Sequence, residues 1–251
     1  MLFRETLLVL GLTLGYSAIY AITTIIATLT APHAPLSQTT VALNTSPAPG
    51  RPLLGLFIEL RDNFFGYLVP AMFAVHMLGR DRDWSPSAQP LGARLGLDSR
   101  RWRFDLLSGT GLALLIGIPG LGFYFLARAL NINMNVAAAN LTEWWAIPVL
   151  ILNAAANGVL EEFIVVGYLV TRLRQVGWGV VAVVAASALL RGSYHLYQGF
   201  GAFIGNAIMG VVFAIFFLLT KRLWPLVLAH TLLDVVAFLG YTLLHNHVSW
   251  L

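Results

Sequence analysis

Long apolar runs separated by short polar segments dominate the chain. A helix that crosses a membrane needs about 20 predominantly apolar residues, and runs of this length recur along the whole sequence. The predicted spans are Glu5–Leu29, Leu53–Leu78, Phe104–Leu130, Trp144–Val170, Gly177–Tyr197, Phe200–Thr220 and Leu223–Leu244. The first run is too long for the apolar part of a signal peptide, so we expect it to stay as an anchor. The pattern predicts an all-α, multi-pass membrane helix bundle of about seven helices.

The composition agrees with a membrane protein. Hydrophobic residues make up 58% of the chain and charged residues 10%, whereas soluble domains carry about 25% charge. The chain has no cysteine, which excludes disulfides and thiolate metal sites. The net charge of +4 comes from basic residues clustered between apolar runs, which is typical of topology signals rather than of a nucleic-acid surface. We therefore expect membrane lipid as a partner and no nucleic acid.

Basic residues predict how the helices are oriented. The loop Gly79–Arg103 is rich in arginine, while Asn131–Glu143 has neither lysine nor arginine. Because cytoplasmic loops of membrane proteins carry an excess of lysine and arginine, the first loop should face inward and the second outward. The short basic segments at 172–174 and 221–222 should also face inward. All these loops agree on an amino terminus inside and a carboxyl terminus outside.

The second predicted span is interrupted by charge. Glu59, Arg61 and Asp62 lie within it, so the segment Leu53–Leu60 either enters the membrane or lies flat on the outer surface. A charge cluster of this kind is usually an interfacial group, and its spacing specifies no particular function.

Several spans contain polar residues in unusual number. These are Asn153, Asn157, Glu161 and Glu162 in the fourth span, Arg191 and His195 in the fifth, Asn206 in the sixth, and His230 and Asp234 in the seventh. Ionisable groups inside a membrane are costly, so they are candidates for a functional site.

Their spacing places them on shared helix faces. Residues four apart lie on one side of a helix, and this spacing relates Asn157 to Glu161, Arg191 to His195, and His230 to Asp234. In lipid such faces must turn toward one another or toward water. The asparagines also have a structural interpretation as hydrogen-bonding groups between helices, and the His–Asp pair as a local contact.

The adjacent glutamates favour chemistry over structure. A structural ion pair with Arg191 would need only one carboxylate, and the second adds repulsion. Together with imidazole groups, Glu161 and Glu162 provide the equipment for general acid–base catalysis.

Several kinds of intramembrane hydrolase are excluded. No histidine is followed by glutamate, so the H-E-x-x-H motif of zinc proteases is absent. Ser193 lies two residues from His195, on a different helix face, and no G-x-S-x-G surrounds it. An aspartyl dyad needs two aspartates within the membrane, and the last four spans contain only Asp234.

Three short motifs resemble those of the CAAX-protease and bacteriocin-processing (Abi) family. They are E-E-F-I-V-V at Glu161–Val166, R-G-S-Y-H at Arg191–His195 and H-T-L-L-D at His230–Asp234. The family pattern is E-E-x-x-x-R, then F-x-x-x-H, then H-x-x-x-N or H-x-x-x-D, on successive helices. The resemblance covers about 144–244, so we expect non-catalytic helices at 1–143 and the protease core, with its last four helices, at 144–251.

Two positions depart from the family pattern. Val166 replaces its arginine and Arg191 replaces its phenylalanine. The guanidinium would thus have moved to a neighbouring helix from which it still reaches the glutamates.

The resemblance implies a role for each residue in peptide hydrolysis. Glu161 with His195 would position and deprotonate a water molecule, and Glu162 would act on Glu161 through like-charge repulsion that Arg191 limits. His230 would donate to the oxyanion. Asp234 would either be protonated or orient His230, and we favour the second interpretation. Asn157 and Asn206 are expected to support the site.

The resemblance leaves the metal open, and we expect no required cofactor. If zinc were bound, its ligands would be Glu161, His195 and His230, because adjacent glutamates point in different directions and strain a tetrahedral site. The expected substrate is an unidentified membrane-associated protein or peptide, and the expected location is a bacterial plasma membrane. The alternatives are a catalytically silent binding or immunity protein on the same scaffold and, with less support, a transporter.

Overall fold

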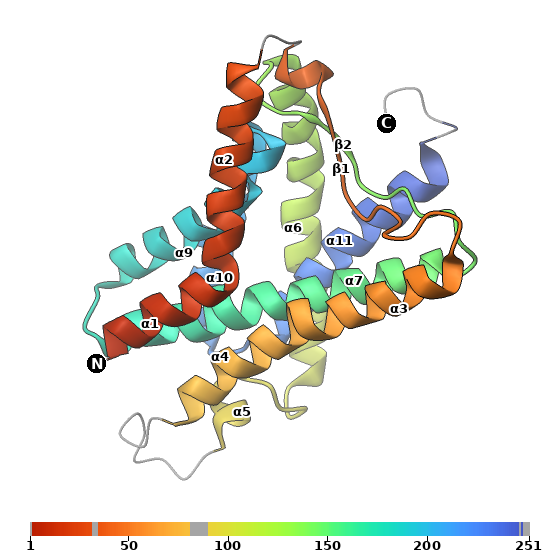
Figure 1. The fold of residues 1–251 in the computed structure, drawn as a ribbon. Coiled ribbons are helices and arrows are strands. Elements are labelled where there is room, and N and C mark those ends of the chain that lie inside the picture. Colours follow the sequence, from red (N-terminus) through yellow and green to blue (C-terminus); the bar gives the residue numbers. More distant parts are fainter. Residues whose placement is uncertain (1, 32–34, 81–89, 246, 248–251) are drawn as a thin grey trace.

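The computed structural model describes residues 2–31, 35–80, 90–245 and 247. Its helices are α1 (Leu2–Leu10), α2 (Tyr16–Thr30), α3 (Pro52–Asp62), α4 (Val69–Gly79), α5 (Leu91–Arg94), α6 (Trp102–Ala129), α7 (Ala146–Glu161), α8 (Leu169–Gln175), α9 (Val180–His195), α10 (Phe200–Thr220) and α11 (Trp224–Leu244). Within the described residues, two short strands, β1 (Thr40–Ala42) and β2 (Asn135–Ala137), form a two-stranded sheet. The predicted all-α, multi-pass membrane bundle is confirmed (Figure 1).

Three π-helical turns join shorter helices into long ones. Gly11–Gly15 connects α1 to α2, Asn63–Leu68 connects α3 to α4, and Glu162–Tyr168 connects α7 to α8. The helix bends sharply between α1 and α2 (Figure 1). Turns of this kind are rare in proteins, and those that do occur often lie at functional sites.

Six described helices are long and apolar enough to cross a membrane. They are Leu2–Thr30, Trp102–Ala129, Ala146–Gln175, Val180–Gln198, Phe200–Thr220 and Trp224–Leu244. The second predicted span, Leu53–Leu78, is present as a helix over residues 52–79, but it is not among the six. This is the segment that Glu59, Arg61 and Asp62 interrupt.

The loops group at two ends of the bundle, as the basic residues predict. At one end, β1 and β2 pair in parallel, with Thr40 opposite Asn135, so the two loops expected outside lie together. At the other end, the Leu223 amide donates to the Leu95 carbonyl at 2.9 Å, which joins two basic segments. Figure 1 shows α5 far from the strands. Which end faces the cytoplasm stays a prediction.

Glycines let the helices of the core approach closely. A Cβ on Gly158 of α7 would lie 2.9 Å from the Thr231 hydroxyl of α11, and a Cβ on Gly210 of α10 would lie 2.8 Å from Cα of Ala188 in α9. Small residues at helix contacts are typical of membrane bundles, where close packing replaces the hydrophobic drive. These contacts bring α7 close to α11 and α10 close to α9. Helices of 1–143 pack around this core, and the division into catalytic and non-catalytic parts stays a prediction.

Candidate active site

The two adjacent glutamates lie at the junction between α7 and its π-helical turn. Glu161 is the last residue of α7, and Glu162 begins the turn. Their exposed fractions are 3% and 0%. Consecutive residues of an ideal α-helix point about 100° apart, yet here both carboxylates contact the same guanidinium.

That guanidinium belongs to Arg191 of α9. Its Nη1 donates to Oε2 of Glu161 at 3.1 Å, and its Nη2 donates to both oxygens of Glu162 at 2.8 Å. Arg191 is fully buried, and so is Val166, which stands where the family motif has its arginine. Arg191 therefore reaches both carboxylates from the neighbouring helix, as the proposed relocation of the charge requires.

Glu162 also fixes the imidazole of His230. The Nδ1 atom of His230 lies 2.6 Å from Oε1 of Glu162. Its Nε2 atom lies 4.0 Å from Oε2 of Glu161 and 3.7 Å from Oδ2 of Asp234. Both of these distances are too long for a hydrogen bond, so Nδ1 is held while Nε2 points into the site.

Asp234 makes no direct hydrogen bond to His230 in this geometry, and its expected role in orienting the ring stays a prediction. Glu162 holds the ring, because it reaches Nδ1 directly. Asp234 accepts a hydrogen bond of 2.9 Å from the Asn157 amide. Asn157 thus takes a place in the site through Asp234.

His195 faces the free oxygen of Glu161. Arg191 donates to Oε2 of Glu161, and the Tyr194 hydroxyl donates to the same oxygen at 2.5 Å. The other oxygen, Oε1, lies 3.7 Å from Nε2 of His195. Neither ring nitrogen of His195 has a hydrogen-bond partner among the described residues. A distance of 3.7 Å excludes a direct bond but suits two groups that share one water molecule.

Tyr194 is a neighbour of Glu161 that was not among the predicted site residues. It is buried, and its ring packs against that of His195 with the centroids 4.8 Å apart. The sequence signal that could have identified it is its position directly before His195.

Two predicted polar residues lie outside this group. Asn206 donates to the Ala202 carbonyl of its own helix, and its expected support of the site stays a prediction. Asn153 donates to Asn44 and to Glu59, which agrees with its interpretation as a hydrogen-bonding group between helices.

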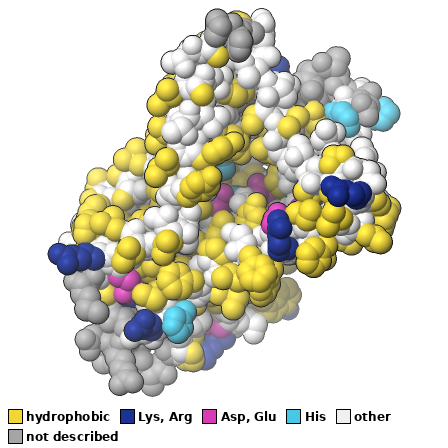
Figure 2. Space-filling model, in the orientation of Figure 1, with side chains coloured by type: hydrophobic (Ala, Val, Ile, Leu, Met, Phe, Trp, Pro, Cys, Tyr) yellow, Lys and Arg dark blue, Asp and Glu magenta, His cyan; other side chains and the backbone are white. Residues whose placement is uncertain are grey.

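The site opens into a hollow on one face of the molecule. Figure 2 shows acidic side chains and a histidine within it, surrounded by hydrophobic side chains. The side chains of His195 and Asp234 are 17% and 19% exposed, whereas that of Glu161 is only 4% exposed. His195 and Asp234 are therefore partly accessible.

The residues present do not fit a catalytic metal. Among the described residues, donor atoms within 4.8 Å of one another come from Glu161, Glu162 and His230, and His195 of the predicted zinc set is not in this group. Both carboxylates already accept bonds from Arg191. A divalent cation there would face the positive charge of the guanidinium, which opposes its binding.

Comparison with known families gives one match. Residues 143–236 match the family described as type II CAAX prenyl endopeptidase Rce1-like. This region contains all three motifs. Comparisons with curated proteins and with solved structures give no match.

Proposed function

Since residues 143–236 match the family described as type II CAAX prenyl endopeptidase Rce1-like, we propose that this chain is an intramembrane endopeptidase in which Glu161 and His195 activate water. The chain is a multi-pass membrane protein, and we place it in a bacterial plasma membrane. The substrate would be a membrane-associated protein or peptide, whether or not it is prenylated. The proposal rests mainly on how the two oxygens of Glu161 are used.

The attacking water would lie between Glu161 and His195. Arg191 and Tyr194 hold Oε2 of Glu161, so Oε1 keeps its lone pairs for a water proton. His195 has unpaired ring nitrogens next to it. As the water oxygen bonds to the carbonyl carbon, one proton passes to this pair. The pair returns the proton to the departing amine when the carbon–nitrogen bond breaks.

His230 would stabilise the charge on the carbonyl oxygen. Glu162 fixes its Nδ1 atom, so only Nε2 can donate to the oxyanion. Donation from both nitrogens requires the imidazolium form, whose charge is balanced by the carboxylates of Glu161, Glu162 and Asp234 around the ring. One such donor is typically worth about 3–4 kcal/mol of transition-state stabilisation.

Asp234 would act through His230 rather than on the oxyanion. A carboxylate that contacted the developing negative charge would oppose it. Its bond from Asn157 and its position 3.7 Å from Nε2 of His230 suit a group that balances the imidazolium. No step of this mechanism needs a metal.

The experiment compares peptides released from membranes that contain different forms of the chain. Wild type, Glu161→Gln and His195→Ala should be expressed at equal levels in otherwise identical membranes. Asn206→Ala serves as the matched control, since Asn206 is an intramembrane polar residue whose amide donates to the Ala202 carbonyl of its own helix.

We expect a set of peptides that appears with wild type and with the control and is lost in both site variants. Peptides that persist in Glu161→Gln would refute the proposed role of the carboxylate. An identical peptide set with and without the chain would favour a catalytically silent scaffold, in which the bonds from Arg191 to both glutamates are purely structural.

A further inference from the structure

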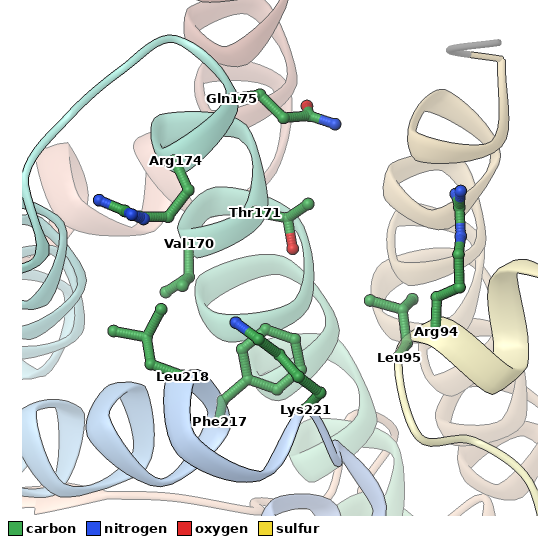
Figure 3. A pocket seen from close by; sticks show the side chains of 9 residues that line it. All are labelled: Arg94, Leu95, Val170, Thr171, Arg174, Gln175, Phe217, Leu218 and Lys221. Atoms are coloured by element: carbon green, nitrogen blue, oxygen red, sulfur yellow. The ribbon is translucent and has the colours of Figure 1, made fainter. Parts of the chain in front are cut away.

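A second polar region lies at the basic end of the bundle, away from the glutamates. It is a cavity of about 300 Å³ (Figure 3). Its lining comes from α5, α8 and α10 and the residues that follow them: Arg94, Leu95, Val170, Thr171, Arg174, Gln175, Phe217, Leu218 and Lys221. Arg174 follows Glu161 by 13 positions, which is about 20 Å along a helix. The cavity is therefore distinct from the candidate active site.

The charged side chains of this cavity are all basic. Arg94, Arg174 and Lys221 contribute cations from three separate segments, and no acidic side chain is among the nine described residues that line it. Figure 3 shows Lys221 between the other two. Burial, followed by the charge of Arg174, lowers the pKa of Lys221. Arg174 and Lys221 thus place two positive charges close enough to repel each other, and an anion would relieve this repulsion.

The rest of the lining is apolar and lies at the ends of helices. Val170 and Phe217 belong to helices that finish at Gln175 and Thr220, where the predicted spans meet the aqueous boundary. Neighbouring Leu219 is 80% exposed and would face lipid. An occupant should therefore combine an anionic group with an apolar part.

We propose that this cavity binds the phosphate headgroup of an anionic phospholipid. Arg174 and Lys221 would donate to the phosphate, and the apolar lining would contact the start of the acyl chains. Basic pockets between transmembrane helices on the cytoplasmic side suit this chemistry, and the volume lies at the lower end of ligand pockets. Lys221 is held in the left-handed conformation at φ 55° by its place at the end of α10.

The test measures lipids retained by the intact protein. Wild type and variants are placed in nanodiscs of phosphatidylcholine with phosphatidylglycerol, released, and analysed by native mass spectrometry. The pocket variant carries Arg174→Gln and Lys221→Asn, because asparagine tolerates the left-handed conformation. The control carries Arg101→Gln and Arg103→Gln, which remove equal charge from exposed positions at the start of α6, at the same end.

Wild type and control should retain bound phosphatidylglycerol. Each removed pocket charge should weaken retention about fivefold, or roughly 25-fold for the double variant. Equal retention by the pocket variant and the control would overturn the site.

A second arm separates a lipid from free phosphate. Basic residues at helix ends also stabilise the helix itself, so the variants can differ in stability even without a ligand. Thermal stability is therefore measured for wild type and both variants without ligand, with inorganic phosphate and with phosphatidylglycerol. Stabilisation of wild type by the lipid but not by phosphate supports the proposal. Equal stabilisation by inorganic phosphate would overturn the lipid assignment.

Discussion

Exchanging two side chains between neighbouring helices tests how the buried glutamate pair is neutralised. Arg191→Phe removes the guanidinium and installs the family's phenylalanine, while Val166→Arg restores the family's arginine. We expect each single variant to lose stability and activity, and the double variant to regain part of both. Phenylalanine at 191 has a ring to pack against, because the Arg191 guanidinium lies 5.4 Å from the Phe213 ring centroid.

The magnitude follows from burial. The side chains of Arg191 and Glu162 are both 0% exposed, and removal of one partner from a buried ion pair costs about 3–5 kcal/mol. Val166→Arg alone places a second cation near Arg191 in a packed position, and such overpacking costs about 1–3 kcal/mol before charge repulsion. Neighbouring groups that share an ion-pair network show coupling energies of about 0.5–3 kcal/mol, and we expect about 2–3 kcal/mol here.

The assay is a double-mutant cycle. Unfolding free energies are measured by titrating the protein in mild-detergent micelles with a denaturing detergent. Peptide release is measured on the same preparations. Arg191→Lys is the control, because it keeps the charge but loses the paired donors that contact Glu162. A double variant as unstable and inactive as Arg191→Phe alone would refute the relocation of the charge.

Other predictions concern a hydroxyl, a metal and a loop contact. Tyr194→Phe removes a hydrogen bond to Glu161, so kcat should fall about 10- to 100-fold while the fold persists; an unchanged kcat would exclude a positioning role. Chelation by EDTA or phenanthroline should leave peptide release intact, and a loss restored by zinc would contradict the metal-free site. The Ser46 hydroxyl holds the pKa of Glu143 below its usual value, so this contact stabilises the fold above a pH of about 4.3 and is lost as the pH falls further. Ser46→Ala should therefore destabilise the protein at neutral pH, and a difference that does not shrink as the pH falls would refute this cause.

Much of the site could be predicted because the membrane restricts where polar groups can lie. Spacing of four residues put His230 and Asp234 on one face, and polar faces in lipid must meet. The structure brings Glu161, Arg191 and His230 together accordingly. The loops at the two ends were predictable from the basic residues for a related reason, since charge is costly to move across a membrane.

The remaining details depend on backbone geometry and on contacts between different helices. In a regular helix the side chains of Glu161 and Glu162 would point about 100° apart. The π-helical turn that begins at Glu162 could not be predicted from the sequence. Spacing also could not show which group holds His230, because Glu162 approaches it from another helix. Asn206 looked like a site residue by its depth alone, but its side chain bonds to its own helix.

The most direct test of the central claim is a high-resolution experimental map of the site. The account predicts a water molecule within about 2.6–3.2 Å of both Oε1 of Glu161 and Nε2 of His195, with Arg191 on the opposite oxygen of Glu161. A metal ion at about 2.0–2.2 Å from these atoms, or side chains that close on each other without a shared water, would contradict it.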